Sequence, residues 1–239
     1  MNLYQELSQV YHEMYQNLFD YDEEFGFYHS VLERFEAKKV VEFGCGTGNL
    51  AKRFLAANFD YLGVDLNQEM LDIAAISLPR HHFLQSDMCT FSSPSLFEAA
   101  LITGRTISYL STNKDILQAF EAIRNCLAEN GLLVFDAIDA TLLFEDFDES
   151  EKELKVGKYK RISYSTPNLQ TGWTWDWHST YFAENEGQFE AIGNDFATVR
   201  AFTQDELKLL LTIAGFEVLE VIEKNTYTWA DHYFVARKK

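Results

Sequence analysis

Cysteines are few in this 239-residue chain, and none has a close partner in sequence. Cys45, Cys89 and Cys126 form an odd set, so neither a disulfide framework nor a cysteine-based zinc site is expected. The histidines also lack a metal-ligand spacing such as H-x-x-x-H. The sequence therefore predicts reduced thiols and no metal site.

Basic residues are scarce as well. The chain has 20 lysines and arginines against 37 aspartates and glutamates, a formal net charge of −17. Nucleic acids and anionic membranes are bound mainly through Lys and Arg, so the charge favours neither as a partner. The one short basic stretch, residues 152–161, has Glu153 within it and Glu151 before it.

Long apolar runs are absent. No run approaches the ~18 residues that cross a bilayer, and the first residues lack the basic and apolar segments of a signal peptide. With 47% hydrophobic and 24% charged residues, the composition is that of a globular protein. We expect one soluble, cytoplasmic domain over residues 1–239, as a monomer or homodimer.

Apolar runs alternate with stretches of helical period up to about residue 140. Strands are predicted at 39–43, 61–64, 82–84, 99–103 and 132–136, with helices at 49–57, 67–78 and 113–130. This alternation is typical of βα units that form a parallel sheet with helices on both faces. It predicts a doubly wound α/β core over residues 35–140.

The character of the sequence changes after residue 150. Three extended, aromatic-rich runs between 154 and 199 predict an antiparallel β insert, residues 150–201, over one end of the sheet. A capped helix then begins at Thr203 and ends at Gly215. A strand pair at 216–222 and 233–236 follows this helix, so residues 202–239 form the final helix and strand hairpin.

The strongest functional signal is the run VVEFGCGTG, residues 40–48, where a strand leads into a glycine turn and a helix. Glycines permit positive φ and close approach of a ligand at the carboxyl end of the first strand. Asp65 ends the second strand, where its carboxylate can accept hydrogen bonds from a ribose diol. Dehydrogenases share both features. Asp87 and Met88 follow the third strand and offer a carboxylate and a backbone N–H to adenine, which dehydrogenases do not usually do.

With these motifs the chain resembles the class I methyltransferases that use S-adenosylmethionine (SAM) and release S-adenosylhomocysteine. VEFGCGTG, LGVDLNQEML and SDM resemble the first three motifs of that family, and LLVFDAID its fifth-strand region. The resemblance implies a Rossmann-like, seven-stranded, mostly parallel sheet, and places Glu42 at the methionine amine. Glu98 stands where the family more often has Asp, which we interpret as harmless. The implied cofactor-binding residues are Glu42, Gly44, Cys45, Gly46, Asp65, Leu66, Asp87, Met88 and Thr103.

The acceptor side is predicted from segments that should meet beside the transferred methyl group. Family members place acceptor residues after the fourth strand, where this chain has Arg105 and Tyr109. Tyrosines at near-helical spacing indicate an N-terminal helix, within a cap of residues 1–34, lying over the cofactor. Tryptophans alternate with His178 along one strand, so one face packs and the other is open to a pocket. The candidates are Tyr109, Arg105 and His178 for catalysis, and Tyr11, Tyr15, Tyr109, Trp175 and Trp177 for substrate binding.

The leading hypothesis is methyl transfer to nitrogen or oxygen of a small polar molecule by direct displacement, for which a catalytic base is optional. No Asn/Asp-Pro-Pro-Tyr tetrad, common in enzymes that methylate DNA bases or protein glutamine, follows the fourth strand. Two alternatives stay open at this point: a non-catalytic SAM-binding or regulatory protein of the same fold, and an NAD-linked oxidoreductase.

Overall fold

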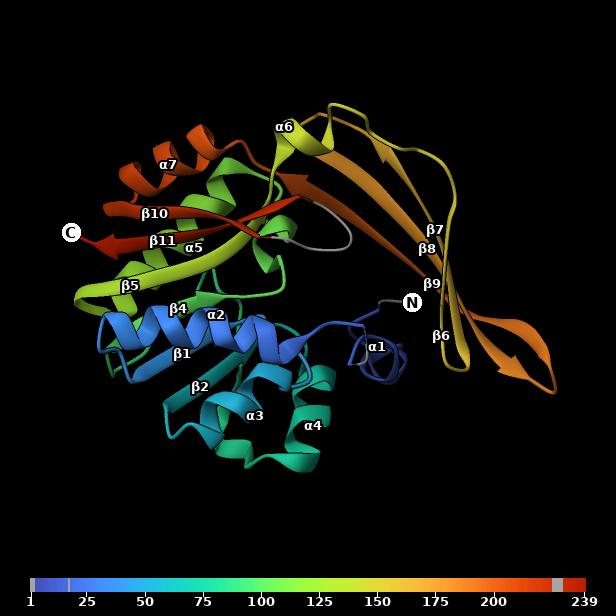
Figure 1. Ribbon diagram of the computed structural model, residues 1–239, viewed down its shortest axis with the longest axis horizontal. Coiled ribbons are helices and arrows are strands. Elements are labelled where there is room, and N and C mark those ends of the chain that lie inside the picture. Colours follow the sequence, from blue (N-terminus) through green and yellow to red (C-terminus); the bar gives the residue numbers. More distant parts are fainter. Residues whose placement is uncertain (1–2, 17, 225–229) are drawn as a thin grey trace.

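The main sheet has seven strands in the order β10-β11-β5-β4-β1-β2-β3. The computed structural model describes residues 3–16, 18–224 and 230–239 (Figure 1). Strand β11 is antiparallel to β5 and β10, and the other neighbours are parallel. The strands are β1 (Lys39–Phe43), β2 (Asp60–Asp65), β3 (Phe83–Gln85), β4 (Phe97–Ile102), β5 (Leu127–Ile138), β10 (Phe216–Lys224) and β11 (Asp231–Lys238). The predicted α/β fold with a seven-stranded, mostly parallel sheet is confirmed.

Helices cover both faces of this sheet, as expected of a doubly wound fold. On one face, α2 (Tyr21–Arg34) and α3 (Asn49–Ala56) bury apolar side chains against β1 and β4. On the other face, α5 (Asn113–Cys126) and α7 (Gln204–Ile213) pack on β1, β4 and β5. Helix α4 (Gln68–Ser77) follows β2. These helices cover the faces of the sheet and leave the carboxyl ends of the central strands for the candidate site.

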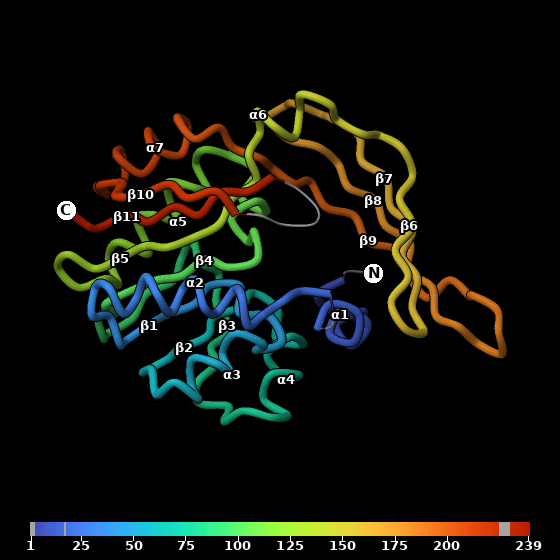
Figure 2. Tube along the Cα trace, viewed as in Figure 1, coloured from blue at the N-terminus to red at the C-terminus, as the bar shows by residue number. Residues whose placement is uncertain are grey.

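A second sheet lies beyond those carboxyl ends (Figure 2). Its four antiparallel strands are β6 (Lys152–Val156), β7 (Tyr159–Pro167), β8 (Trp173–Asn185) and β9 (Gln188–Ala201). Helix α1 (Ser8–Tyr15) packs its apolar side chains against Tyr159 and Tyr181 of this sheet. The antiparallel insert predicted over residues 150–201 is therefore present. Helix α1 lies between it and the main domain.

Short elements complete the chain, and one predicted boundary is wrong. The 3₁₀ turns η1 (Arg80–His82) and η2 (Thr106–Tyr109) precede β3 and α5, and α6 (Ala140–Leu143) follows β5. Helix α5 ends at Cys126 and not at 130, because Leu127 is fully buried and pairs with Phe97 in the sheet. Within the described residues, no helix is both long and apolar enough to span a bilayer.

Helix starts follow the predicted capping residues in one case and depart from them in another. Thr203 Oγ1 accepts a hydrogen bond from the backbone N–H of Glu206, as the sequence pattern predicts. Asn67 precedes α4 as predicted, but its side chain makes no capping bond. Its amide oxygen accepts from Gln5 Nε2 of the N-terminal segment instead. Asn67 thus joins α4 to the segment that leads into α1.

Candidate active site

The glycine turn between β1 and α3 is held against β2. Gly44, Gly46 and Gly48 all have positive φ, and the N–H groups of Gly44 and Cys45 donate to the carbonyl of Val64. A Cβ built on Gly44 would overlap the side chain of Thr106. Glycine at 44 is thus required both by the backbone and by close packing against the loop after β4.

Asp65, at the end of β2, tethers this turn. Its Oδ2 accepts from the N–H of Gly46 and its Oδ1 from the N–H of Asn67, both at 2.9 Å. Burial raises the pKa of Asp65 even though these backbone hydrogen bonds lower it. Each carboxylate oxygen keeps a second acceptor site, so binding of a ribose diol stays a prediction.

Glu42 is buried near the end of β1 and accepts hydrogen bonds from β2 and from the residue that follows β4. The hydroxyls of Tyr61 and Thr103 each donate to its carboxylate at 2.6 Å. Burial raises the pKa of Glu42 to about 7, although both of these hydrogen bonds lower it. A cationic ligand beside Glu42 would stabilise its ionised form.

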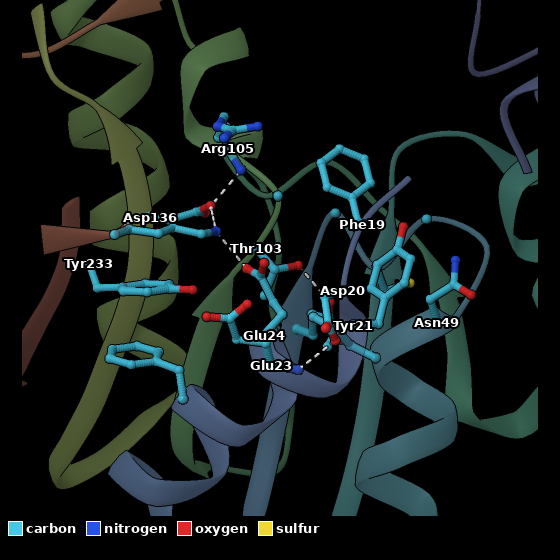
Figure 3. A pocket seen from close by; sticks show the side chains of 18 of the residues that line it. Phe19, Asp20, Tyr21, Glu23, Glu24, Asn49, Thr103, Arg105, Asp136 and Tyr233 are labelled. Atoms are coloured by element: carbon cyan, nitrogen blue, oxygen red, sulfur yellow. Dashed lines mark hydrogen bonds and ion pairs between the residues drawn. The ribbon is translucent and has the colours of Figure 1, made fainter. Parts of the chain in front are cut away.

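The first cavity, of about 660 Å³, opens beside this turn (Figure 3). Acidic side chains dominate its charged lining: Asp20, Glu23, Glu24, Glu42, Asp136 and Glu223, against Arg105 and Lys224. A Cβ on Gly104, whose φ is +62°, would meet nothing within 4 Å, so the backbone there is open to a ligand. This environment suits a cationic molecule and would repel a phosphate.

Buried ion pairs fix one wall of the first cavity. Lys224 Nζ lies 2.7 Å from both Glu24 Oε1 and Asp136 Oδ2, so it joins α2, β5 and β10. The backbone N–H of Arg105 donates to Asp136 at 2.9 Å, and its Nε lies 2.6 Å from Asp231 Oδ2. Arg105 is therefore held in place by the ends of β5 and β11.

The second cavity, of about 700 Å³, lies under the insert sheet. Aromatic residues line it: Tyr4, Tyr11, Tyr15, Phe19, Tyr109, Phe147, Tyr164, Trp175 and Trp177. Tyr11 and Tyr15 stack with ring centroids 4.6 Å apart, and the hydroxyls of Tyr4 and Tyr109 are 2.5 Å apart. The contact between Tyr4 and Tyr109 holds the N-terminal segment against η2. Apolar walls with a few polar groups are typical of small-molecule sites.

The two cavities share a common boundary. Tyr11, Leu18 and Phe19 line both from the N-terminal side, and Gly104 and Arg105 line both from the loop after β4. The acidic cavity and the aromatic cavity therefore meet at Gly104 and Arg105, at the carboxyl edge of the sheet.

Most of the predicted site residues lie at these cavities, while four predicted cofactor residues do not. Glu42, Gly44, Cys45, Gly46 and Thr103 line the first cavity, and Tyr15, Tyr109, Trp175 and Trp177 the second, with Tyr11 and Arg105 at both. Asp65, Leu66, Asp87 and Met88 line neither described cavity. Their roles toward ribose and adenine remain predictions.

Helix α1 explains why the first cavity stops short of Asp65. His12 Nδ1 lies 3.0 Å from Thr47 Oγ1, so α1 sits directly on the glycine turn. Asp65 also contributes to the raised pKa of Tyr11, whose largest cause is burial, so α1 and Asp65 are electrostatic neighbours. Farther along, Asp87 is exposed and accepts from the N–H of Cys89 at 2.8 Å.

His178 lines neither described cavity, unlike the other acceptor candidates, so its catalytic role stays a prediction. It stacks on Tyr164 with centroids 4.7 Å apart and packs against Phe196, which is well exposed. The strand alternation was predicted correctly, but the face with Trp175 and Trp177 meets the cavity. In the part of the chain that the structure describes, no group of three or more His, Cys, Asp or Glu could hold a metal ion.

No sequence pattern predicted the ion-paired wall of the first cavity. Glu24, Lys224 and Asp231 lie far from the motifs in sequence and carry no spacing signal of their own. Asp136 is the last residue of a predicted strand. A polar residue at the carboxyl end of a strand was the one signal in the sequence that pointed to this wall.

Comparison with known proteins decides the family. A family model described as a methyltransferase domain matches residues 12–221. The chain belongs to this methyltransferase family. The expected kinship with class I SAM-dependent methyltransferases is thereby confirmed, and the oxidoreductase alternative is not retained.

Individual proteins similar to this methyltransferase agree with the family assignment. A protein of Geobacillus sp. (strain WCH70), named as a methyltransferase, is 29% identical over 214 residues, 84% of this chain and 85% of that protein. A SAM-dependent methyltransferase of Clostridium acetobutylicum ATCC 824 has a TM-score of 0.82 at 16% identity, covering 97% of each chain. The sugar N-methyltransferase KedS8 of Streptoalloteichus sp ATCC 53650 has a TM-score of 0.77 at 21% identity, covering 92% and 88%. These structures share the fold.

Proposed function

We propose that this methyltransferase transfers a methyl group from SAM to a nitrogen or oxygen of a small polar molecule. The observation that supports it most is the junction of an acidic, glycine-lined cavity with an aromatic one at Gly104 and Arg105. A cofactor and an acceptor bound on the two sides would meet at that boundary.

The residues of the first cavity fit SAM. The cofactor has a cationic sulfonium and an ammonium group and no phosphate, which matches the excess of carboxylates in this cavity. Glu42 and Thr103 would hold the methionine end, and Asp65 and Asp87 the ribose and adenine. When bound, SAM supplies a methyl group made electrophilic by the positive sulfur.

The chain's own contribution is positioning and exclusion of water. Burial raises the pKa of Tyr109 to about 12, so its phenol stays protonated near neutral pH and is a poor general base. Arg105 is fixed by Asp136 and Asp231. We infer that Tyr109 and Arg105 orient the acceptor, and that alignment and desolvation supply most of the acceleration.

The kind of acceptor is inferred from the shape and lining of the second cavity. Tyr11 and Tyr109 line it from α1 and η2, and Trp175 and Trp177 line it from the insert sheet. A concave cavity with aromatic walls on two sides suits a small molecule better than a nucleic acid or protein segment. The name of the sugar N-methyltransferase KedS8 supports nitrogen as one acceptor atom.

Calorimetry and a methylation screen test this proposal. We expect saturable binding of SAM and S-adenosylhomocysteine, and release of S-adenosylhomocysteine with small amines, hydroxyl compounds or carboxylates. Transfer RNA, DNA and protein extracts form the comparison arm, and turnover confined to them would overturn the proposal. Tight SAM binding without turnover on any acceptor would favour the non-catalytic alternative.

A further inference from the structure

A half-buried cation in the second cavity forms no ion pair with a carboxylate of the described residues. Arg161 on β7 lines this cavity, donates from Nη1 to the hydroxyl of Tyr15, and places its guanidinium carbon 5.1 Å from the ring centroid of Trp177. None of the ion pairs within the described residues includes Arg161. Its guanidinium stays protonated at any physiological pH, so a positive charge faces this cavity. Three carboxylates also line the cavity, those of Asp146, Asp148 and Glu153, but all belong to exposed residues, and Asp148 and Glu153 pair with Lys152 and Lys160.

Arg161 also has spare hydrogen-bonding capacity. Among the described residues its buried Nε makes no hydrogen bond, and the hydroxyl of Tyr181, its cross-strand neighbour on β8, lies beside the guanidinium. Buried polar groups without partners cost free energy, and most are satisfied in folded proteins. Asp195, a carboxylate of the next strand β9, accepts from the backbone N–H of Leu3 at 3.1 Å instead of pairing with Arg161.

Further hydroxyl groups lie along the same wall. Ser163 and Ser165 follow Arg161 at every second position of β7, so they share its face of the strand, and both line the cavity. Ser108 of η2 lines it too, and its buried hydroxyl makes no hydrogen bond to any residue that the structure describes. One fixed cation with hydroxyl groups beside it is a good environment for a carboxylate or a phosphate group.

We propose that the methyl acceptor is an acidic small molecule whose carboxylate or phosphate group is bound by Arg161. This inference rests on the proposed function and specifies its substrate class. The stacked rings of Tyr15 and Tyr11 connect Arg161 with the boundary of the two cavities. The anionic group therefore lies at the insert sheet, and the methyl-accepting atom lies toward Gly104. Because the first cavity is acidic, an anion is also kept out of the cofactor side.

A purely structural role for Arg161, as a link between the insert sheet and α1, makes a different prediction. Replacing Arg161 would then lower the melting temperature and weaken the binding of charged and uncharged acceptors alike. An anion-binding role weakens the binding of acids selectively. The experiment must therefore compare acids with neutral molecules of the same shape.

Benzoate and phenyl phosphate serve as acidic probes, and benzamide and phenol as their neutral counterparts. Each is titrated by calorimetry into the protein loaded with S-adenosylhomocysteine. The variants are Arg161→Gln, Arg161→Lys and the control Lys160→Gln. Lys160 is adjacent on β7 but lies over the rings of Phe182 and Phe189 and lines neither cavity. Melting temperatures are recorded for all of them.

We expect at least one acid to bind wild type about tenfold or more tightly than its neutral counterpart. Arg161→Gln should abolish this preference, Arg161→Lys should retain part of it, and Lys160→Gln should leave it unchanged. Preference for benzoate over phenyl phosphate, or the reverse, identifies the anion. Equal binding of acids and neutral probes to wild type would overturn the proposal even if Arg161→Gln does not fold. Failure to bind S-adenosylhomocysteine would instead overturn the proposed function.

Discussion

The backbone N–H of Gly46 donates to Oδ2 of Asp65 across 2.9 Å, so the carboxylate at the end of β2 holds the glycine turn at the end of β1. One residue thus serves two purposes in the proposed site. It shapes the turn that lines the first cavity, and it keeps acceptor capacity for a ribose diol. Removing the carboxylate should therefore weaken cofactor binding both by loosening the turn and by removing the acceptor for the ribose.

Asp65→Ala should weaken the binding of SAM and S-adenosylhomocysteine about tenfold or more. The loss of a charge-assisted acceptor accounts for about 1.5–3 kcal/mol. The matched control is Asp60→Ala, because Asp60 begins the same strand and is exposed. Isothermal calorimetry on the folded variants measures both affinities. Unchanged affinity in Asp65→Ala would remove Asp65 from the site.

Gly44→Ala should disturb both the turn and the loop after β4. The new Cβ would overlap Thr106, and the left-handed backbone at φ +74° adds a strain of roughly 1 kcal/mol. Gly157→Ala is the control, because Gly157 has φ +56° and open space around its Cβ position. We expect Gly157→Ala to lose only the strain energy in chemical denaturation. Equal losses in the two variants, with SAM affinity intact in Gly44→Ala, would show that the Thr106 contact is unimportant.

Arg200→Ala should destabilise the fold by about 3 kcal/mol or more. Arg200 on β9 is 1% exposed and reaches Glu206 Oε1, the side chain of Asn113 and the carbonyl of Ser111, which joins the insert sheet to the main domain. Its removal leaves those acceptors without their cation. Urea denaturation measures the effect.

Arg237→Ala is the matched control for Arg200→Ala. Arg237 also pairs with a glutamate, Glu217, at 2.7 Å, but that pair is exposed and should contribute less than about 1 kcal/mol. If both variants lost the same stability, burial of Arg200 would not be the deciding factor.

Local features of this fold could be predicted from the sequence because their causes are local. The run from Val40 to Gly48 fixes a buried strand and a left-handed turn, and Thr203 caps α7 through a residue three positions away. The end of α5 was misplaced because Leu127 continues into the sheet. There the tertiary pairing of Leu127 with Phe97 outweighs the local pattern that predicted a helix up to residue 130.

Long-range contacts of the site could not be predicted in this way. Lys224 meets Glu24, 200 positions away, and Arg161 meets Tyr15, 146 positions away. No periodicity or spacing links such pairs. His178 shows the same limit, since alternation assigns two strand faces but the packing of α1 decides which face meets the cavity.

The pH dependence of cofactor binding should report on Glu42. The pKa of Glu42 in the cofactor-free protein is raised by burial to about 7, and a cationic ligand beside the carboxylate would lower it again. Binding of SAM should therefore release a proton, and its affinity should rise with pH between about 6 and 8. At pH 6 only about a tenth of the carboxylate is ionised, so affinity should be about tenfold lower than at pH 8.

The same residue should affect stability with the opposite sign. The folded-state pKa of Glu42, about 7, lies above its ordinary value of 4.5, so its contribution is fully present below pH 4.5 and is lost as pH rises through 7. Glu42→Gln should flatten this fall in the free energy of unfolding and remove the pH dependence of SAM affinity. Asp231 complicates the readout, because burial raises its pKa to about 7 as well, against the opposing effect of Arg105. Asp231→Asn is therefore the control, and it should retain the rise in SAM affinity with pH. A profile that stays steep in Glu42→Gln and becomes flat in Asp231→Asn would assign the proton to Asp231 and remove Glu42 as the partner of the cofactor's positive charge.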